Sequence, residues 1–172
     1  VGAGKTYEEA NTPVRFALGD TRFAVLAYTN LMPRSFEATA NRPGLSSFSI
    51  EKATGAIRAA KQEADIVIVS FHWGDEYQTR SNALQQNIGR AMIDAGADLI
   101  VGHHPHVAQE IEEYKNGWII YSLGNFVFDQ NFSDDTRRGL MVKVTVRDKK
   151  IENMEPIEIR FTKTFQPEMV YN

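Results

Sequence analysis

Hydrophobic and polar residues follow strand and helix spacings along the first two thirds of the chain. Residues 13–18 alternate between apolar and polar, Gly19-Asp20 follows as a turn signal, and residues 22–28 are almost entirely apolar. This pattern predicts two paired strands, the second buried on both faces. Residues 30–47 show no periodicity, which predicts a long loop. Such a loop either borders a binding site or is an irregular surface excursion.

The next part of the chain alternates between helix and strand patterns. Apolar residues at helical spacing predict one helix over 50–64 and a second that ends before Gly96. A short β-branched run follows each helix, at 65–71 and at 98–101. Helix–strand–helix–strand order is typical of a parallel sheet with right-handed crossovers. We therefore expect parallel β-α units over residues 50–106.

The last third of the chain reads as strands separated by turns. Asn116-Gly117 and residues 148–150 are turn signals, and no pattern predicts a further helix. We expect antiparallel strands over residues 107–161, and a single mixed α/β (α+β) domain over residues 1–172. The expected strands are 107–114, 117–123, 139–146 and 151–161.

The composition of the 172-residue chain narrows the class of protein. A content of 42% apolar and 24% charged residues is typical of a globular domain. A net charge of −3 argues against a nucleic-acid partner, because such proteins usually carry a basic face. The absence of cysteine excludes disulfides, zinc–thiolate sites and cysteine nucleophiles. No stretch approaches the roughly 18–20 apolar residues of a membrane span.

All four histidines lie in two short stretches, each directly after a predicted strand. His72 follows the first β-branched run, and His103, His104 and His106 follow the second. The carboxyl ends of neighbouring parallel strands share one crevice, where α/β sheets place their ligands. Imidazoles gathered there predict a metal site. The alternative is a hydrogen-bonded polar cluster that lines a pocket.

The His104-Pro105-His106 tripeptide carries most of this prediction. Side chains two residues apart point to the same side of an extended backbone, and Pro105 favours extended conformations for His104. We therefore expect both imidazoles to project together past the strand end. Glu76 is a nearby carboxylate that we expect to orient an imidazole. The alternatives for Glu76 are a metal ligand or a solvated loop charge.

Four further residues are candidates for contact with a substrate. Trp73 either packs beneath the site or contacts the substrate, and Asn125 can offer its amide. Arg137 and Arg138 either clamp an anionic substrate or pair with neighbouring aspartates. The chain has no nucleophile elbow and no glycine-rich phosphate loop after a strand. A hydrolytic mechanism would therefore use water activated by a metal.

Three motifs taken together point to a known family. They are His72-Trp73-Gly74 with Glu76-Tyr77, GADLIVGHHPHV at 96–107, and YSLGNFVFDQ at 121–130. In these motifs the chain resembles the CapA (PgsA-like) family of bacterial capsule or poly-γ-glutamate synthesis proteins. That family is similar to the calcineurin-like metallophosphoesterases. The resemblance covers nearly the whole chain.

The resemblance implies a metallophosphoesterase-like α/β/β/α layered sandwich with one or two divalent metal ions at the strand ends. The expected metal is Mn, Fe, Zn or Mg. By motif position His72 matches the superfamily's isolated histidine, and His104 and His106 match its H-x-H pair. These three histidines are the expected metal ligands, and together with Glu76 they are the expected catalytic residues. His103 occupies a position that varies.

The chain also departs from the superfamily pattern. The Asp-x-His, Gly-Asp-x-x-Asp and Gly-Asn-His-Asp/Glu elements do not occur, since Gly19-Asp20 is a hairpin turn and Asn30 is not followed by histidine. These elements lie upstream in the superfamily. We therefore expect the chain to be the C-terminal part of the domain.

The resemblance implies a role in the synthesis of capsule or poly-γ-glutamate, an anionic cell-surface polymer, with a metal-dependent phosphoesterase-type hydrolase site. The alternative is a non-catalytic accessory or polymer-binding subunit that keeps the fold. The expected partners are an anionic polymer or phosphate ester and other capsule-synthesis proteins, with homo-oligomers a further expectation. We expect an extracytoplasmic location, with any membrane anchor outside this sequence.

Overall fold

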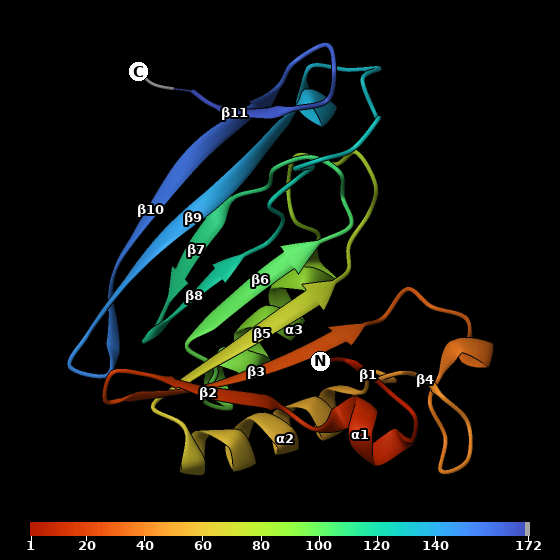
Figure 1. Ribbon diagram of the computed structural model, residues 1–172, viewed down its shortest axis with the longest axis vertical. Helices are drawn as coiled ribbons and strands as arrows, with labels where there is room; N and C mark the ends of the chain where they lie inside the picture. The colour runs from red at the N-terminus through yellow and green to blue at the C-terminus, as the bar shows by residue number, and fades with distance from the viewer. Residues whose placement is uncertain (171–172) are drawn as a thin grey trace.

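A six-stranded mixed sheet forms the centre of the computed structural model, which describes residues 1–170 (Figure 1). Its strand order is β2-β3-β5-β6-β8-β7. The inner strands β3, β5, β6 and β8 run parallel, and β2 and β7 run antiparallel at the two edges. The strands are β2 (Val14–Leu18), β3 (Thr21–Thr29), β5 (Ile66–His72), β6 (Leu99–His103), β7 (Ile111–Tyr114) and β8 (Gly117–Ile120).

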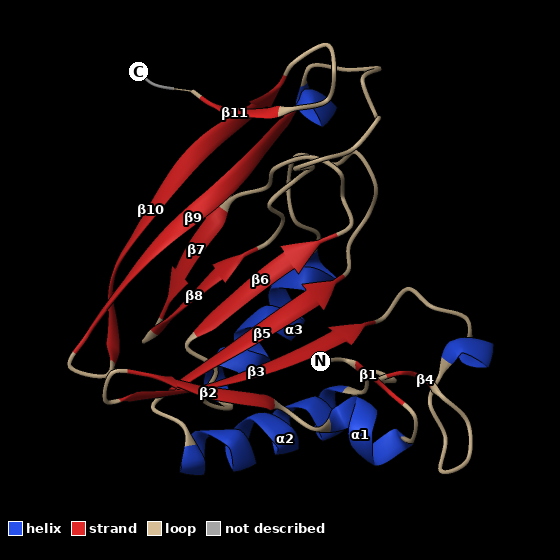
Figure 2. Cartoon of the chain, viewed as in Figure 1, coloured by secondary structure: helices blue, strands red, loops and turns tan. Residues whose placement is uncertain are grey.

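Two helices cover one face of this sheet (Figure 2). They are α2 (Ile50–Glu63) and α3 (Ala83–Asp94), as the helical spacing predicts. The side chain of Ser49 caps α2, and a capping box between Asn82 and Gln85 begins α3. Their apolar sides pack on β3, β5 and β6 in one continuous core, which includes Ile57, Met92 and Phe71. None of the helices in the described residues combines the length and apolar character needed to cross a lipid bilayer.

A second sheet packs on part of the opposite face. Its order is β11-β10-β9, formed by β9 (Arg138–Arg147), β10 (Lys150–Phe161) and β11 (Pro167–Met169). Met154 of β10 packs against Leu99 and Ile120 of the central sheet in a separate core. Helices, central sheet and second sheet are thus three successive layers of the expected α/β/β/α arrangement (Figure 2).

Short elements surround this framework near the N-terminus. They are β1 (Ala3–Gly4), α1 (Tyr7–Asn11), the 3-10 turn η1 (Arg34–Phe36) and β4 (Gly44–Leu45). β1 and β4 pair with each other. This pairing anchors residues 44–45 of the region predicted as a long loop, 30–47, to the N-terminal segment. Another 3-10 turn, η2 (Asp135–Arg137), precedes β9.

The antiparallel arrangement predicted for residues 107–161 holds only in part. β9 and β10 form an antiparallel hairpin, but β8 pairs in parallel with β6 and extends the central sheet. The reason is burial on both faces, since Ile119 lies in the helix-side core and Ile120 in the core between the sheets. A strand apolar on both faces belongs inside a sheet covered on both sides.

One of the two predicted turns lies where expected, and the other lies one residue earlier in the chain. The β9–β10 turn has positive φ at Asp148 and Lys149, 49° and 61°, as a type I′ turn requires. The β7–β8 turn is Lys115-Asn116, one residue earlier than predicted. Gly117 is the first residue of β8 and is needed for close packing there, because a Cβ would lie 2.7 Å from Ile93 Cδ1.

Candidate metal centre

The two histidine stretches meet at one edge of the central sheet. β5 and β6 are adjacent parallel strands, and His72 pairs in register with His103 at their carboxyl ends. Phe71 and Trp73 flank His72 and are fully buried on the helix side. Alternation along β5 therefore directs His72 to the opposite face. The predicted meeting of the two stretches is confirmed.

The turn after β6 brings His104 and His106 together by a backbone that was not predicted. His104 has φ of 104° and His106 has φ of 61°, so neither residue is extended. The two ring centroids are nevertheless 6.0 Å apart. The backbone N–H of Tyr77 donates to the Pro105 carbonyl at 2.8 Å and holds the turn. Positive φ at residues other than glycine is strained and is concentrated at functional sites.

Glu76 joins these two histidines in a compact group. Glu76, His104 and His106 each place one potential ligand atom within 4.8 Å of the others. Two imidazole nitrogens and a carboxylate oxygen suit Zn, Mn and Fe ions. Glu76 therefore lies where a ligand would lie, whereas the sequence favoured an orienting role. Its ligand role remains a prediction.

Asn125 fixes the proton position on His106. The side-chain amide nitrogen of Asn125 donates to the Thr136 carbonyl oxygen at 3.0 Å and also faces Gln130 Oε1 at 3.3 Å. Asn125 Oδ1 is thereby directed at His106 Nδ1, 2.8 Å away. An amide oxygen only accepts, so His106 Nδ1 must carry the proton. The lone pair of Nε2 is then free to bind a metal, as outer partners of metal-binding histidines commonly arrange.

His72 lies beside the group rather than within it. Its ring centroid is 4.6 Å from that of His104, and its Nδ1 is 3.2 Å from Thr29 Oγ1. Among residues 1–170, its donor atoms do not share the 4.8 Å cluster. The ring of His104 thus neighbours the rings of both His72 and His106, and a ligand role for His72 remains a prediction.

The surroundings favour neutral imidazoles. Burial lowers the pKa of His72, and the neighbouring His104 lowers it further. Burial also lowers the pKa of His104, although the negative charge of Glu76 opposes this effect. The neutral form is the one that binds metals, so both rings are prepared for ligation near neutral pH.

His103 lies next to His72, with which it pairs in register across β5 and β6. Burial lowers its pKa, and it lines a cavity of about 410 Å³ with Leu123, Phe126 and Leu140. Glu76, His104 and His106 are not among the residues that line this cavity. The low weight given to His103 by its motif position stays a prediction.

Trp73 supports the site from below. It is 0% exposed, and its Nε1 donates to the Tyr121 carbonyl oxygen at 2.8 Å. Gly102 allows this contact, because a Cβ there would lie 2.0 Å from the same oxygen and 2.6 Å from Trp73 Nε1. Of the two predicted roles, packing is observed. Contact with a substrate does not fit full burial.

Asn125, Arg137 and Arg138 are the other predicted substrate-binding side chains. The polar atoms of Asn125 are directed at protein groups, as described above. Arg137 and Arg138 line a surface hollow with Asp134 and Arg160. Arg138 Nε lies 3.9 Å from Glu158 Oε1, and the ion pairs of the described residues include none from either arginine to Asp134 or Asp135. A role in substrate binding remains a prediction for all three.

The sequence did not single out three residues that hold the site. Thr29 contacts His72, Gln130 bridges Asn125 and the Tyr77 hydroxyl, and Thr136 supplies the carbonyl that orients Asn125. Thr29 could have been found, since it ends the strand next to β5 and pairs in register with His72. Gln130 ends the third family motif, which pointed to the family but not to this contact, and Thr136 lies in η2 without a sequence signal.

Comparisons with known proteins agree with these observations. Residues 1–130 match the family described as "Bacterial capsule synthesis protein PGA_cap". The chain is 40% identical over 152 residues to "Capsule biosynthesis protein CapA" of Bacillus anthracis, covering 86% of this chain and 37% of that protein. It is 41% identical over 162 residues to "PGA biosynthesis protein CapA" of Bacillus subtilis, covering 92% and 42%. The chain thus spans less than half the length of these relatives.

A solved structure of a novel phosphatase from Mycoplasma pneumoniae has a similar fold. The TM-score is 0.57 with 15% sequence identity, over 86% of this chain and 57% of that one. At this identity the likeness concerns the fold alone, and it supports the expected mixed α/β layered fold class. The family match extends over most of the chain, and it includes both histidine stretches. The chain therefore belongs to the bacterial capsule synthesis protein PGA_cap family.

Proposed function

We propose that this chain supplies the histidine side of a divalent-metal centre in a protein that makes an anionic capsule polymer of the poly-γ-glutamate type, with metal-dependent phosphoesterase-type hydrolysis as its chemistry. The observation that carries the proposal is the Glu76–His104–His106 group, whose donor atoms lie within 4.8 Å of one another. Family membership and the names of the two CapA relatives support the polymer context.

The donor set fits a metal on chemical grounds. Asn125 holds His106 in the tautomer with a free Nε2, and burial lowers the pKa of His104, which favours its neutral form. Glu76 adds one negative charge to the two neutral imidazoles, which offsets part of the charge of a divalent ion. His72, next to His104, is the candidate ligand for a second ion.

The residues of the chain have separate tasks in this chemistry. A divalent ion supplies Lewis-acid polarisation of the scissile group and a lower pKa for water. His104 and Glu76 fix its position, and the Asn125 bond keeps His106 from rotating. The strained turn at 104–106 holds both imidazoles in place before a ligand arrives, which reduces the reorganisation that binding would otherwise require.

Metal titration tests the proposal directly. The 172-residue chain is titrated with Zn²⁺ and Mn²⁺ against a chromogenic chelator, next to His104→Ala, His106→Ala and Glu76→Gln. We expect binding to the original chain and a loss of about tenfold or more in affinity in each histidine variant, since each removes one ligand.

His103→Ala is the matched control, because it removes a histidine of the same stretch that is outside the Glu76–His104–His106 group. It should bind metal like the original chain. Equal affinity in His104→Ala and the original chain would contradict the metal centre. Hydrolysis of a chromogenic phosphodiester by the full-length protein, lost in His104→Ala, then tests the catalytic part.

A non-catalytic accessory role is the second candidate. It is favoured by the composition of the group, which has a single carboxylate among the described residues, and that carboxylate is exposed. Two adjacent ions need more negative charge than this. If polymer production persists in the full-length protein after His104→Ala, the accessory role is supported over hydrolysis. For either role we propose an extracytoplasmic location, with other capsule-synthesis proteins as partners.

A further inference from the structure

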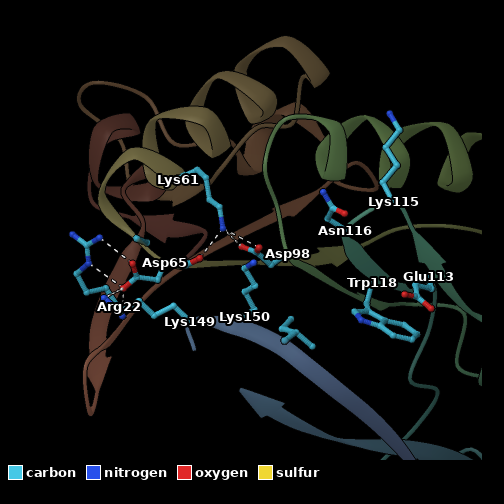
Figure 3. Close-up of a pocket in the computed structure, with 12 residues that line it drawn as sticks. Arg22, Lys61, Asp65, Asp98, Glu113, Lys115, Asn116, Trp118, Lys149 and Lys150 are labelled. Carbon is cyan, nitrogen blue, oxygen red and sulfur yellow. Dashed lines mark hydrogen bonds and ion pairs between the residues drawn. The ribbon is translucent and has the colours of Figure 1, made fainter. Parts of the chain in front are cut away.

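A second polar cavity lies at the end of the central sheet opposite the histidines (Figure 3). Its walls include Arg22 near the start of β3, Asp65 just before β5 and Asp98 just before β6. The β9–β10 turn closes it with Lys149 and Lys150. The histidines lie at the other end of these strands, so the seven residues of β5 separate the two places by about 20 Å.

This cavity, called here the lysine pocket, is richer in cations than in anions. Its volume is about 670 Å³, within the range of small-molecule sites. The lining carboxylates are Asp65, Asp98 and Glu113, and the lining cations are Arg22, Lys61, Lys115, Lys149 and Lys150. Lys115 is paired with Asp94, which lies outside the lining, so four cations remain against three carboxylates. The chain as a whole carries a net charge of −3. A local excess of positive charge on such a chain favours an anionic ligand.

The wall formed by Asp65 and Asp98 is already neutralised. Arg22 donates to Asp65 through Nε and Nη2, both at 3.1 Å, and this guanidinium lowers the pKa of Asp65 to about 2. Lys61 Nζ donates to Asp98 at 2.7 and 2.9 Å, and Asp98 also accepts from the Val67 backbone. These pairs hold the wall in place and leave little of its charge for a ligand.

Lys149, in the β9–β10 turn, and Lys150, the first residue of β10, are less engaged by carboxylates than the cations of that wall. Lys149 Nζ lies 3.9 Å from Asp65, which is already engaged by Arg22. Among the described residues Lys150 takes part in no ion pair. Both side chains are exposed, and Figure 3 shows Lys150 extending from the strand toward Lys61 and Asp98. These two ammonium groups are therefore available to an anion that enters the pocket.

The remaining wall is apolar. Trp118 and Ile151 are partly buried and line the pocket beside the lysines, and Figure 3 shows Trp118 next to Glu113. Methylene groups of a ligand can pack on such a surface while its charges meet the ammonium groups. Ammonium groups bind carboxylates and phosphates alike as point charges, and the one guanidinium is engaged by Asp65. The choice of a carboxylate chain as the ligand therefore rests on the polymer context of the proposed function.

We infer that the lysine pocket binds a flexible chain that carries carboxylates separated by methylene groups, the chemistry of a γ-linked oligoglutamate. Lys149 and Lys150 contact the carboxylates, and Trp118 and Ile151 pack against the methylenes. The polymer stays bound at one end of the strands while the histidine group lies at the other. The site is separate from the proposed metal centre, and its occupancy does not require metal.

Fluorescence titration with a γ-linked oligoglutamate of defined length tests this inference. Trp118 lines the pocket, so binding should change its fluorescence. Trp73 is fully buried elsewhere and should not respond. We expect Lys149→Gln/Lys150→Gln to weaken binding by about fivefold to tenfold, the range for losing two exposed charge contacts. Lys150→Gln alone, outside the turn with positive φ, should give a smaller loss. Trp118→Phe should remove the fluorescence change.

Lys5→Gln/Lys143→Gln is the matched control, because it removes the same charge outside the pocket. Equal affinities in the original chain, Lys150→Gln and both double variants would overturn the inference, as would equal losses in the two double variants. His104→Ala should bind the oligomer like the original chain, and the lysine variants should bind Zn²⁺ unchanged. Failure of oligomer binding with intact metal binding overturns this inference alone, and the reverse result overturns the metal centre alone.

Discussion

At the scale of single residues, the candidate site depends on one hydrogen-bond direction. Asn125 is 6% exposed, and its amide group points at the Thr136 carbonyl, so its oxygen must accept from His106. The sequence presented Asn125 as a substrate contact because it follows a glycine near a strand end. Its orientation toward His106 depends on Thr136, eleven residues away in the 3-10 turn η2.

Replacement of Asn125 tests this positioning role. We expect Asn125→Ala to weaken Zn²⁺ binding by about tenfold or more, because His106 loses the acceptor that fixes its tautomer. Asn125→Asp keeps an acceptor at the same place and should recover much of the affinity. Metal titration of both variants, with Asn131→Ala as an exposed control, gives the comparison. Unchanged affinity in Asn125→Ala would show that the bond does not position His106.

At the scale of elements, the histidine turn rests on a close contact between β6 and the chain after β8. Gly102, Trp73 and the Tyr121 carbonyl meet there, and the sequence marked Trp73 as a packing candidate without identifying its partner. The contact joins segments that are far apart in sequence. It depends on the parallel β6–β8 pairing that local pattern did not predict.

Two glycine substitutions separate packing from local propensity. Gly102→Ala places a Cβ 2.0 Å from a backbone oxygen, so we expect it to lower the free energy of unfolding by about 3 kcal/mol or more. Gly55→Ala lies on the exposed side of α2 with no atom within 4 Å of the new Cβ. It should raise the free energy of unfolding by about 0.5–1 kcal/mol. Urea unfolding measures both, and a neutral Gly102→Ala would refute the tight contact.

At the scale of the whole molecule, the central sheet is covered unevenly. The edge strand β2 is exposed along its length, and Val14, Phe16 and Leu18 are 47%, 49% and 73% exposed. β9 is the edge of the second sheet, with β10 as its single partner strand. Unpaired, apolar edges are sites of association with other chains. This observation is consistent with the expected homo-oligomer, which remains a prediction.

Sedimentation velocity tests this expectation. We expect the 172-residue chain to associate as its concentration rises. Leu18→Lys should increase the dissociation constant by about tenfold or more, because burial of a leucine contributes about 1.5–3 kcal/mol. Leu84→Lys, at an exposed position of α3, is the control and should leave association unchanged. A monomer at all concentrations would contradict the expectation.

The sequence by itself determined the elements and the location of the histidines. Apolar spacing marks α2 and α3, β-branched runs mark β5 and β6, and the histidines follow those runs directly, because each signal lies in a few neighbouring residues. The tertiary structure decided the rest: the insertion of β8 beside β6, the positive φ of His104 and His106, the Asn125 bond and the lysine pocket. Each of these depends on contacts between distant segments, whose energies a local pattern does not contain.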